Sequence, residues 1–476
     1  MTTSGRTTFA ILVVGVCSYT LLQSMTVPAL PRIQAELGTD QVTVSWVLSA
    51  FLISASVATP IAGRLGDSHG RKRMLVASLA LLALGALVAA LAPNIWVLVV
   101  ARVIQGFAGG VLPLAFGIIR DELAPARLAS AIALLSSLMS VGFGAGIVVT
   151  GPILDLLGYR FLFLLPTLAA AAAAVGAALL IPESARRVRQ PLRLVPVVAL
   201  AGWLIALLVC ISRAPSWGWT STATVGGLLT ALGVFLLWVR IESVIDAPLV
   251  DLRLMATRGV AAPNVVALLI GMAMYGSFGF LPQFTQTPSE SGYGFGASVA
   301  EAGHLMLPMA AFSFLGGVVS ASLSSRVGSR SVIIAGCWLT GAGLLAAALA
   351  HQHEWQILAS GGVTGLGSGL CFAALANAVV DAVPTERTGV ATGMNANLRT
   401  IGGSVGSAGV ATIVTAQLLP SGYPTEHGYT VGFVALAVTA FLAGLAAITI
   451  PGRALERNLT PIQRKDRLCS APLPGS

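Results

Sequence analysis

The sequence predicts an all-α membrane protein with fourteen transmembrane helices. Only 9% of its 476 residues are charged and 56% are hydrophobic, whereas a soluble domain carries about 25% charged residues. Apolar segments of about 20 residues, the length that crosses a bilayer as a helix, recur along the whole chain. Soluble enzymes, nucleic-acid binders and disordered scaffolds are therefore excluded as classes.

The fourteen apolar segments follow one another with short connections, none of which could hold a soluble domain. They lie near residues 8–29, 44–63, 74–92, 96–119, 129–152, 161–181, 194–212, 221–239, 260–282, 300–320, 331–350, 355–380, 390–416 and 430–450. The first continues to Ala29 and many others follow, so we interpret it as an uncleaved span rather than a signal peptide. The segment 390–416 is the least apolar, because it contains Asn395, Asn397 and Arg399.

The basic residues indicate the orientation. If both termini are cytoplasmic, three of the 27 Lys and Arg residues (Arg32, Arg160 and Arg213) fall outside and two (Arg102 and Arg399) fall within spans. All the others lie in cytoplasmic segments, as the positive-inside rule requires. The net charge of +9 is then a topology signal. We expect a protein of the cell membrane whose partner is the lipid bilayer and not a nucleic acid.

The two ends of the chain repeat each other. Asp121 to Arg127 (DELAPAR) recurs as Asp381 to Arg387 (DAVPTER), and each copy is followed by a pair of glycines at the same spacing. Such repeats are typical of transporters that are built from two similar bundles. The predicted division is a six-helix bundle at 1–182, two inserted transmembrane helices with their cytoplasmic loops at 183–258, a second six-helix bundle at 259–451 and a cytoplasmic tail at 452–476.

The loop after the second segment carries a motif, GRLGDSHGRKR, that includes Gly63, Asp67, Gly70 and Arg71. The glycines permit a tight turn, and Asp67 can cap a helix and pair with a basic neighbour. This motif resembles the signature between spans two and three of the major facilitator superfamily. The resemblance implies two six-helix bundles and a conformational latch formed by these four residues on the cytoplasmic side.

The fourth segment contains RVIQG, with Arg102 and Gln105 on one helical face. An arginine at the centre of a span costs about 2.5–3.5 kcal/mol on insertion scales, so it should face the bundle interior. Hydrogen bonds to carbonyl groups, made only for packing, would explain it. The motif also looks like the span-four signature of the superfamily, which implies that Arg102 and Gln105 help to couple protonation to movement.

The SWGW sequence ending at Trp219, the PLVDLRL sequence around Asp251 and the fourteen spans together resemble the fourteen-spanner drug:proton antiporters. That subgroup often has an acidic residue in span one, where this chain has Gln23. Its fifth-span signature, Gly-Pro-xx-Gly-Gly, is replaced by a stretch from Gly146 to Gly151 with a proline only at Pro152.

Glu301 and His304 are spaced to share one face of a helix near the outer end of the tenth segment. A carboxylate and an imidazole can exchange protons near neutral pH, which predicts a role in proton coupling and loss of coupled export in Glu301→Gln. The alternative is that both residues line the outer rim in water and start a helix.

Several polar and aromatic side chains within spans predict the wall of a central cavity, although a Met and aromatic stripe is also typical of a packed core. The predicted cavity residues are Gln23, Tyr275, Phe278, Gln283, Met306, Asn395 and Arg399. The glycine pairs of the repeat, Gly142 with Gly146 and Gly402 with Gly406, predict close helix packing.

No enzymatic constellation accompanies these features. Gly402 to Gly406 matches the hydrolase G-x-S-x-G pattern but lies in an apolar segment without the strand that this motif needs. We expect no enzyme activity, no metal and no cofactor, and the absence of a Walker motif excludes ATP as the driver. The resemblance predicts a monomeric, secondary-active exporter of hydrophobic or amphipathic small molecules in exchange for protons. Facilitated or proton-symport uptake is the alternative, and a non-transporting membrane receptor is the alternative from another class.

Overall fold

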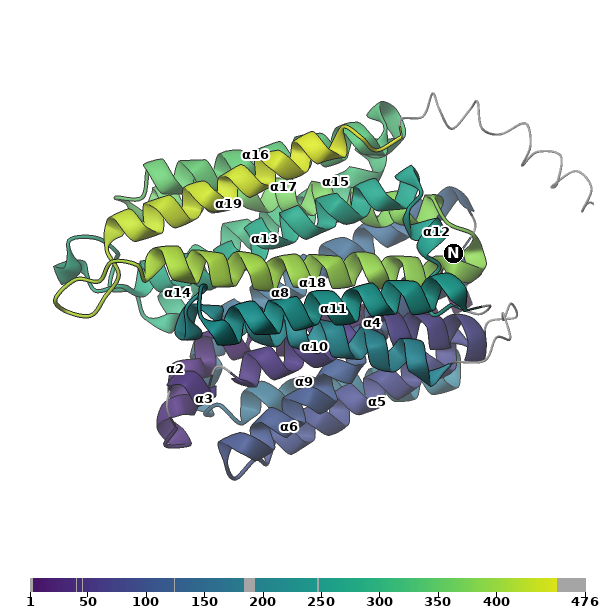
Figure 1. Ribbon diagram of the computed structural model, residues 1–476, viewed down its shortest axis with the longest axis horizontal. Coiled ribbons are helices and arrows are strands. Elements are labelled where there is room, and N and C mark those ends of the chain that lie inside the picture. The colour runs from purple at the N-terminus through teal and green to yellow at the C-terminus, as the bar shows by residue number, and fades with distance from the viewer. Residues whose placement is uncertain are drawn as a thin grey trace, which may run out of the picture.

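The computed structural model describes residues 3–39, 41–44, 46–123, 125–183, 193–245 and 248–451. Within these ranges the chain forms nineteen α-helices and three short 3-10 helices, with no β-strand. The long helices run side by side along one direction (Figure 1). The expected tail at 452–476 and parts of the segment 183–258 lie outside the described residues.

The helices follow the apolar segments closely. Their bounds are α1 (Thr3–Ser24), α2 (Thr26–Glu36), α3 (Gln41–Val44), α4 (Trp46–His69), α5 (Arg71–Ala90), α6 (Ile95–Gly106), α7 (Val111–Glu122), α8 (Pro125–Leu156), α9 (Phe161–Leu180), α10 (Leu194–Trp217), α11 (Thr222–Val244), α12 (Leu252–Met255), α13 (Arg258–Gln286), α14 (Val299–Leu305), α15 (Leu307–Val327), α16 (Ser329–Leu349), α17 (Glu354–Asp381), α18 (Thr388–Val414) and α19 (Glu426–Ala447). The 3-10 helices are η1 (Phe107–Gly110), η2 (Ser289–Ser291) and η3 (Thr385–Arg387).

Thirteen stretches of the described chain are long and apolar enough to cross a membrane. The fourteenth predicted span is α18, whose 27 residues are about 40 Å long at 1.5 Å per residue. It is too polar to satisfy the hydropathy criterion, as its asparagines and arginine led us to expect. The predicted all-helical fold with about fourteen spans is therefore confirmed.

Three of the spans are interrupted. The helices α1 and α2, α6 and α7, and α14 and α15 each combine into one continuous apolar stretch. The break between α6 and α7 is the 3-10 turn η1, which contains Gly109 and Gly110 and packs closely on α4. Small residues let helix backbones approach in this way within a membrane.

The buried apolar side chains form separate clusters that correspond to successive parts of the chain. One cluster is built almost wholly from α1 to α9, which we call the first bundle, and another mainly from α13 to α19, the second bundle. A third joins α10 and α11, the inserted pair, to α4 and α18. The two bundles meet along two seams, because α4 packs against α18 and α8 packs against α15.

The inserted pair covers the seam between α4 and α18 (Figure 1). Trp203 of α10 packs against Trp238 of α11, with ring centroids 5.9 Å apart. At the far end of the pair, the Trp219 indole N–H donates a 2.6 Å hydrogen bond to Thr412 of α18, and the Arg213 guanidinium lies over the Trp46 ring of α4. The pair thus contacts both bundles.

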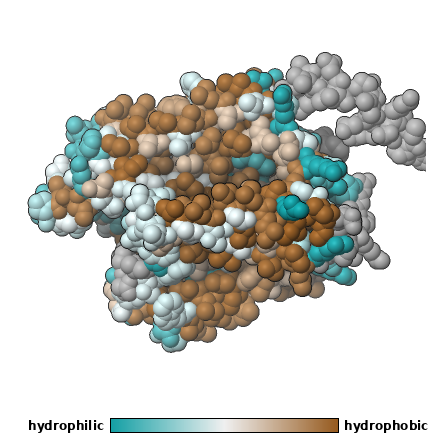
Figure 2. All heavy atoms as spheres, in the orientation of Figure 1, coloured by the Kyte–Doolittle hydropathy of each residue, from teal (hydrophilic) through white to brown (hydrophobic). Residues whose placement is uncertain are grey.

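The surface is divided into an apolar belt and two hydrophilic ends (Figure 2). Many large apolar side chains of the belt are exposed, including Leu179 of α9 and Leu229 and Leu236 of α11. A water-exposed surface would not carry so many, so this belt is the face that meets lipid. The start of α1 and the end of α19 lie at the same end of the molecule (Figure 1).

The internal repeat is visible in the backbone. Gly70 precedes α5 with a φ of 114°, and Gly328 precedes α16 with a φ of 89°. These two glycines occupy matching positions in the repeated sequence. Residues with a side chain rarely adopt positive φ values, so glycine is required at both turns.

Candidate functional site

A cavity lies between the two bundles. Its wall is formed by α1, α7 and α8 of the first bundle and by α13, α17 and α18 of the second. The lining residues are Thr20, Gln23, Leu112, Phe116, Ser136, Met139, Phe143, Tyr275, Phe278, Phe372, Ala376, Val379, Thr392, Asn395, Ala396 and Arg399.

Three aromatic rings form one face of the cavity and join the two bundles. Phe143 of α8 packs on Phe278 of α13 with ring centroids 4.5 Å apart. Tyr275 lies edge-on to both rings, with its centroid 6.4 Å from each. Phe143 was not among the predicted cavity residues. Its position beside Gly142 and Gly144, in a glycine-rich stretch where a large aromatic ring is unusual, is the signal that could have identified it.

The polar groups of the cavity are concentrated on α18. The Asn395 amide donates 3.0 Å and 3.3 Å hydrogen bonds to Asn264 Oδ1 and the Pro263 carbonyl, so α13 fixes its orientation. The Arg399 guanidinium carbon lies 5.0 Å from the centroid of the Phe372 ring. In the part of the chain that the structure describes, Arg399 makes no hydrogen bond or ion pair.

Two predicted cavity residues lie elsewhere. Gln283 lies two turns after Tyr275, in the last turn of α13. Its side chain is exposed and does not line the cavity. Met306 is buried at the junction of α14 and α15, where it belongs to the apolar core of the second bundle. Both residues were chosen for their helical face, and a face does not determine depth along a helix.

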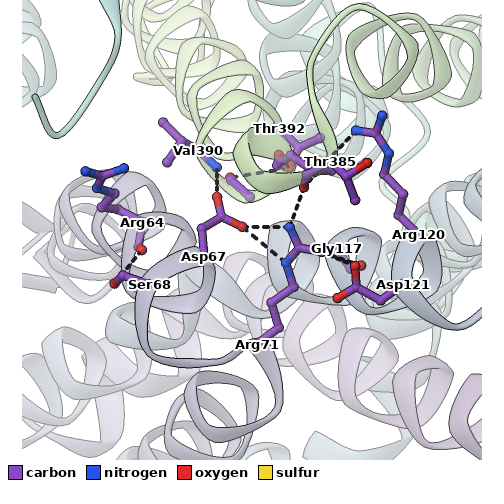
Figure 3. Close-up of polar contacts among 12 residues, drawn as sticks. Arg64, Asp67, Ser68, Arg71, Gly117, Arg120, Asp121, Thr385, Val390 and Thr392 are labelled. Carbon is purple, nitrogen blue, oxygen red and sulfur yellow. Dashed lines mark hydrogen bonds and ion pairs between the residues drawn. The ribbon is translucent and has the colours of Figure 1, made fainter. Parts of the chain in front are cut away.

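Asp67 and Arg71 form a buried ion pair where α4 meets α5 (Figure 3). Arg71 donates to Asp67 Oδ1 at 2.8 Å and 3.1 Å. It also donates to Asp121 of α7 at 2.7 Å and to the Thr385 carbonyl of the second bundle at 2.6 Å. The second oxygen of Asp67 accepts from the Val390 N–H at 3.3 Å. The pair therefore holds one end of the seam closed, and we call this end of the molecule the latch end.

Arg120 of α7 adds three more hydrogen bonds across the seam. It donates to Thr388 Oγ1 at 2.5 Å, to the Val383 carbonyl at 2.9 Å and to the Pro384 carbonyl at 3.4 Å, and Figure 3 shows it beside the Asp67 network. From the sequence, Arg120 was expected only to be one of the basic residues of the cytoplasmic segments. Arg120 directly precedes the repeated motif that begins at Asp121, and this position could have indicated a role at the contact between the bundles.

Two glycines allow close contacts at the latch end, Gly63 between the two bundles and Gly70 with the segment that follows α9. A Cβ atom on Gly63 would lie 2.5 Å from the Gly389 carbonyl oxygen of α18, which is closer than real Cβ atoms come. A Cβ atom on Gly70 would lie 2.5 Å from Glu183 Oε1. Any larger residue at position 63 would separate α4 from α18.

The linker that follows the inserted pair also contacts the latch end, through Asp251 and Arg387. Asp251 caps α12 by accepting from the Arg253 and Leu254 N–H groups, and Arg387 forms an ion pair with it. Partial burial acts to raise the pKa of Asp251, but the hydrogen bonds from Leu254 and Arg387 prevail and hold it below its ordinary value. These contacts give a structural reason for the aspartate of the PLVDLRL motif.

Arg102 and Gln105 lie away from the cavity, in the core of the first bundle. Arg102 is 0% exposed and donates to the Val47 carbonyl at 3.0 Å, the Leu22 carbonyl at 3.2 Å and Gln105 Oε1 at 2.6 Å. Its guanidinium also stacks over Phe51. These contacts join α6 to α1 and α4, which is the carbonyl-bonded arrangement that packing alone would produce.

Glu301 and His304 also lie outside the cavity lining, and both are exposed. The Glu301 carboxylate accepts from the Ser298 N–H at 2.8 Å, and Ser298 Oγ accepts from the Glu301 N–H, which completes a capping box at the start of α14. These contacts favour the interpretation in which Glu301 starts a helix at the rim.

The predicted packing glycines contact equivalent helices in the two bundles. Gly142 and Gly146 of α8 lie against the Thr20 and Ser24 side chains of α1. In the second bundle, Gly402 and Gly406 of α18 lie against carbonyl groups of α13. A Cβ atom at any of the four would collide with the partner helix. Among the described residues there is also no group of three or more His, Cys, Asp or Glu side chains that could hold a metal ion.

The fold and the cavity define the class: a polytopic helical membrane transporter made of two similar bundles. The sequence profile of the Major Facilitator Superfamily matches residues 12–407 and 264–466. The chain belongs to this superfamily.

Relatives of the chain include bacterial proteins that are named for drug resistance and antibiotic export. The chain is 28% identical over 394 residues to the multidrug resistance protein B homolog of Mycobacterium tuberculosis strain H37Rv, covering 80% of this chain and 71% of the relative. It is 26% identical over 451 residues to the tetracenomycin C resistance and export protein of Streptomyces glaucescens, covering 92% and 83%. It is 28% identical over 435 residues to the methylenomycin A resistance protein of Streptomyces coelicolor, covering 90% and 88%.

A solved structure has the same fold. The human organic anion transporter MFSD10 (TETRAN) superposes with a TM-score of 0.66 at 15% sequence identity, covering 93% of this chain and 99% of that one. At this identity the likeness concerns the fold alone. The resemblance to drug-exporting members of the superfamily that the sequence predicted is confirmed by the bacterial relatives.

Proposed function

We propose that this protein is a secondary-active exporter that moves hydrophobic or amphipathic small molecules out of the cell in exchange for protons. The observation that carries the proposal is a cavity lined by both bundles and closed at one end by hydrogen bonds between them. Such an arrangement supports alternating access, in which one bundle rocks against the other around a fixed site. The names of the bacterial relatives support export of drugs and antibiotics.

We propose that the protein lies in the cell membrane with its latch end and both termini on the cytoplasmic side. The excess of Lys and Arg at this end supports that orientation. The state seen here is then closed toward the cytoplasm. We also propose that the chain divides into two bundles at 1–182 and 259–451 around the inserted pair, and that a single chain suffices for transport.

The proton must act on a titratable group, and the cavity lining contains no carboxylate among the described residues. Asp67 is 4% exposed and lies on the seam itself. Protonation would neutralise the charge that faces Arg71 and would weaken its hydrogen bond from Val390, so it would favour opening of the latch end. Arg102 and Gln105 would then transmit the change between α1, α4 and α6.

The test uses inverted membrane vesicles with an acidified lumen and a panel of lipophilic dyes. Export by antiport predicts that dye accumulates in the lumen as protons leave it, and that a protonophore abolishes accumulation. Vesicles without the protein are the control. Movement that ignores the gradient, or movement out of the lumen with protons, would instead support facilitated or symport uptake. A folded protein that moves no dye would support a receptor.

A further inference from the structure

Among the described residues, the lining of the central cavity contains one full charge, and that charge is positive. Arg399 projects from α18 into the lining, whereas the other polar lining groups are the Gln23 and Asn395 amides, the Tyr275 phenol and the hydroxyls of Thr20, Ser136 and Thr392. The described lining contains no Asp or Glu. Any charged compound that enters therefore meets a cation without a counter-charge.

Arg399 is also available for a ligand. Its one described partner is the Phe372 ring face, and a cation over an aromatic face keeps its hydrogen-bond donors for a further partner. A guanidinium has a planar fork of N–H groups that matches a carboxylate or sulfonate with two parallel hydrogen bonds. Arg102, the arginine buried in the core of the first bundle, is already bonded to carbonyl groups and lies outside the lining.

The rest of the cavity suits an aromatic body. Phe143, Tyr275 and Phe278 present ring faces and edges, and Phe116 and Met139 extend the apolar wall. The Gln23 amide and the Tyr275 hydroxyl make no hydrogen bond within the described chain, so they can orient polar substituents. An uncompensated cation within a membrane span is costly, and an anionic ligand would relieve that cost.

We propose that the cavity selects aromatic or amphipathic organic acids, with Arg399 as the residue that binds the acidic group. This inference names the substrate class of the exporter proposed above and rests on that function. Lipophilic cations are disfavoured because they would meet Arg399 without a carboxylate nearby. Neutral aromatic compounds are expected to bind with intermediate affinity, since they use the same rings but leave Arg399 unpaired.

The test compares three probes that share one ring system: pyrenecarboxylic acid, pyrenemethanol and pyrenemethylamine. Their binding to the purified full-length protein in nanodiscs is measured by pyrene fluorescence at pH 7. We expect the acid to bind about tenfold or more tightly than the alcohol, as for a charge-assisted bidentate pair, and the amine to bind most weakly.

Variants assign the effect to one side chain. Arg399→Gln should remove the preference for the acid while pyrenemethanol affinity stays within about twofold, which also shows that the variant is folded. Arg399→Lys should keep part of the preference because it keeps the charge. Arg326→Gln, an exposed arginine outside the cavity, should leave it intact. Equal or tighter binding of the amine, acid binding no tighter than that of the alcohol, or an unchanged acid preference in Arg399→Gln would overturn the inference.

The same probes in acidified inverted vesicles separate this inference from the proposed function. If the acid binds selectively but no probe moves with the proton gradient, the ligand class stands and export fails. If all three probes are exported without preference, and binding shows none, export stands and the ligand class fails.

Discussion

Replacing Arg120 by alanine removes a side chain whose three hydrogen bonds all cross from the first bundle to the second, to Val383, Pro384 and Thr388. Hydrogen bonds to a charged group are worth about 1.5–3 kcal/mol each when buried. Arg120 is half-buried, so solvent reduces this to about 1 kcal/mol each, or about 2–3 kcal/mol in total. These bonds exist only while the latch end is closed, so their loss changes the balance between states and leaves each bundle intact. The expected effect is about a 30- to 150-fold shift toward the state open at that end.

Spin labels at positions 73 and 326 can measure this shift. Both arginines are exposed at the latch end, one in each bundle, and the labels are introduced after the native cysteines are replaced. Pulsed electron–electron double resonance measures the distance between the two labels. It should give one main short distance in the parent and an increased population of longer distances in Arg120→Ala.

Arg127→Ala is the matched control, because Arg127 is an exposed arginine at the same end of the first bundle. It should reproduce the parent distances. If Arg120→Ala also reproduces them, the hydrogen bonds across the seam do not hold the bundles together, and the assignment of this end as a gate is refuted.

Three further substitutions test other parts of the structure. Asp67→Asn removes the charge opposite Arg71 and should abolish gradient-driven dye export in vesicles with at least tenfold loss of rate; a wild-type rate would exclude Asp67 as the coupling group. Glu301→Gln should retain export and thermal stability, because glutamine also completes a capping box with Ser298; loss of coupled export, with normal insertion, would reinstate Glu301 as a proton carrier. Glu242 of α11 is 3% exposed, and the Leu249 and Val250 N–H groups and the Trp238 indole act on its carboxylate, so Glu242→Ala, which leaves these donors without an acceptor, should lower the apparent unfolding temperature by a few degrees, about 1–2 kcal/mol; an unchanged temperature would show that these donors do not depend on Glu242.

The sequence predicted those parts of the fold that depend on local composition. Apolar length predicted the fourteen spans, of which the segment that forms α18 was the least apolar because it contains Asn395, Asn397 and Arg399. The latch loop was recognised from its Gly63, Asp67 and Arg71 pattern, since close approach and charge pairing depend on residue type.

Tertiary geometry accounts for what the sequence left open. The partners of Arg120, at Val383, Pro384 and Thr388, are more than two hundred residues away in the sequence, and no local pattern reports such a pairing. Gln283 and Met306 were assigned to the cavity from their helical face, but their depth depends on where α13 ends and where α14 meets α15. Phe143 enters the cavity because Gly142 and Gly144 bring α8 close to α1 and α15.

The inserted pair makes the two seams unequal. On one side α8 meets α15 directly, so a single layer of helices separates the cavity from lipid. On the other side α10 lies over the junction of α4 and α18, and the barrier is two helices thick. A compound dissolved in the bilayer therefore has a shorter lateral path to the binding site between α8 and α15. The two bundles share a sequence repeat, but the two seams between them differ in how thickly helices separate the cavity from lipid.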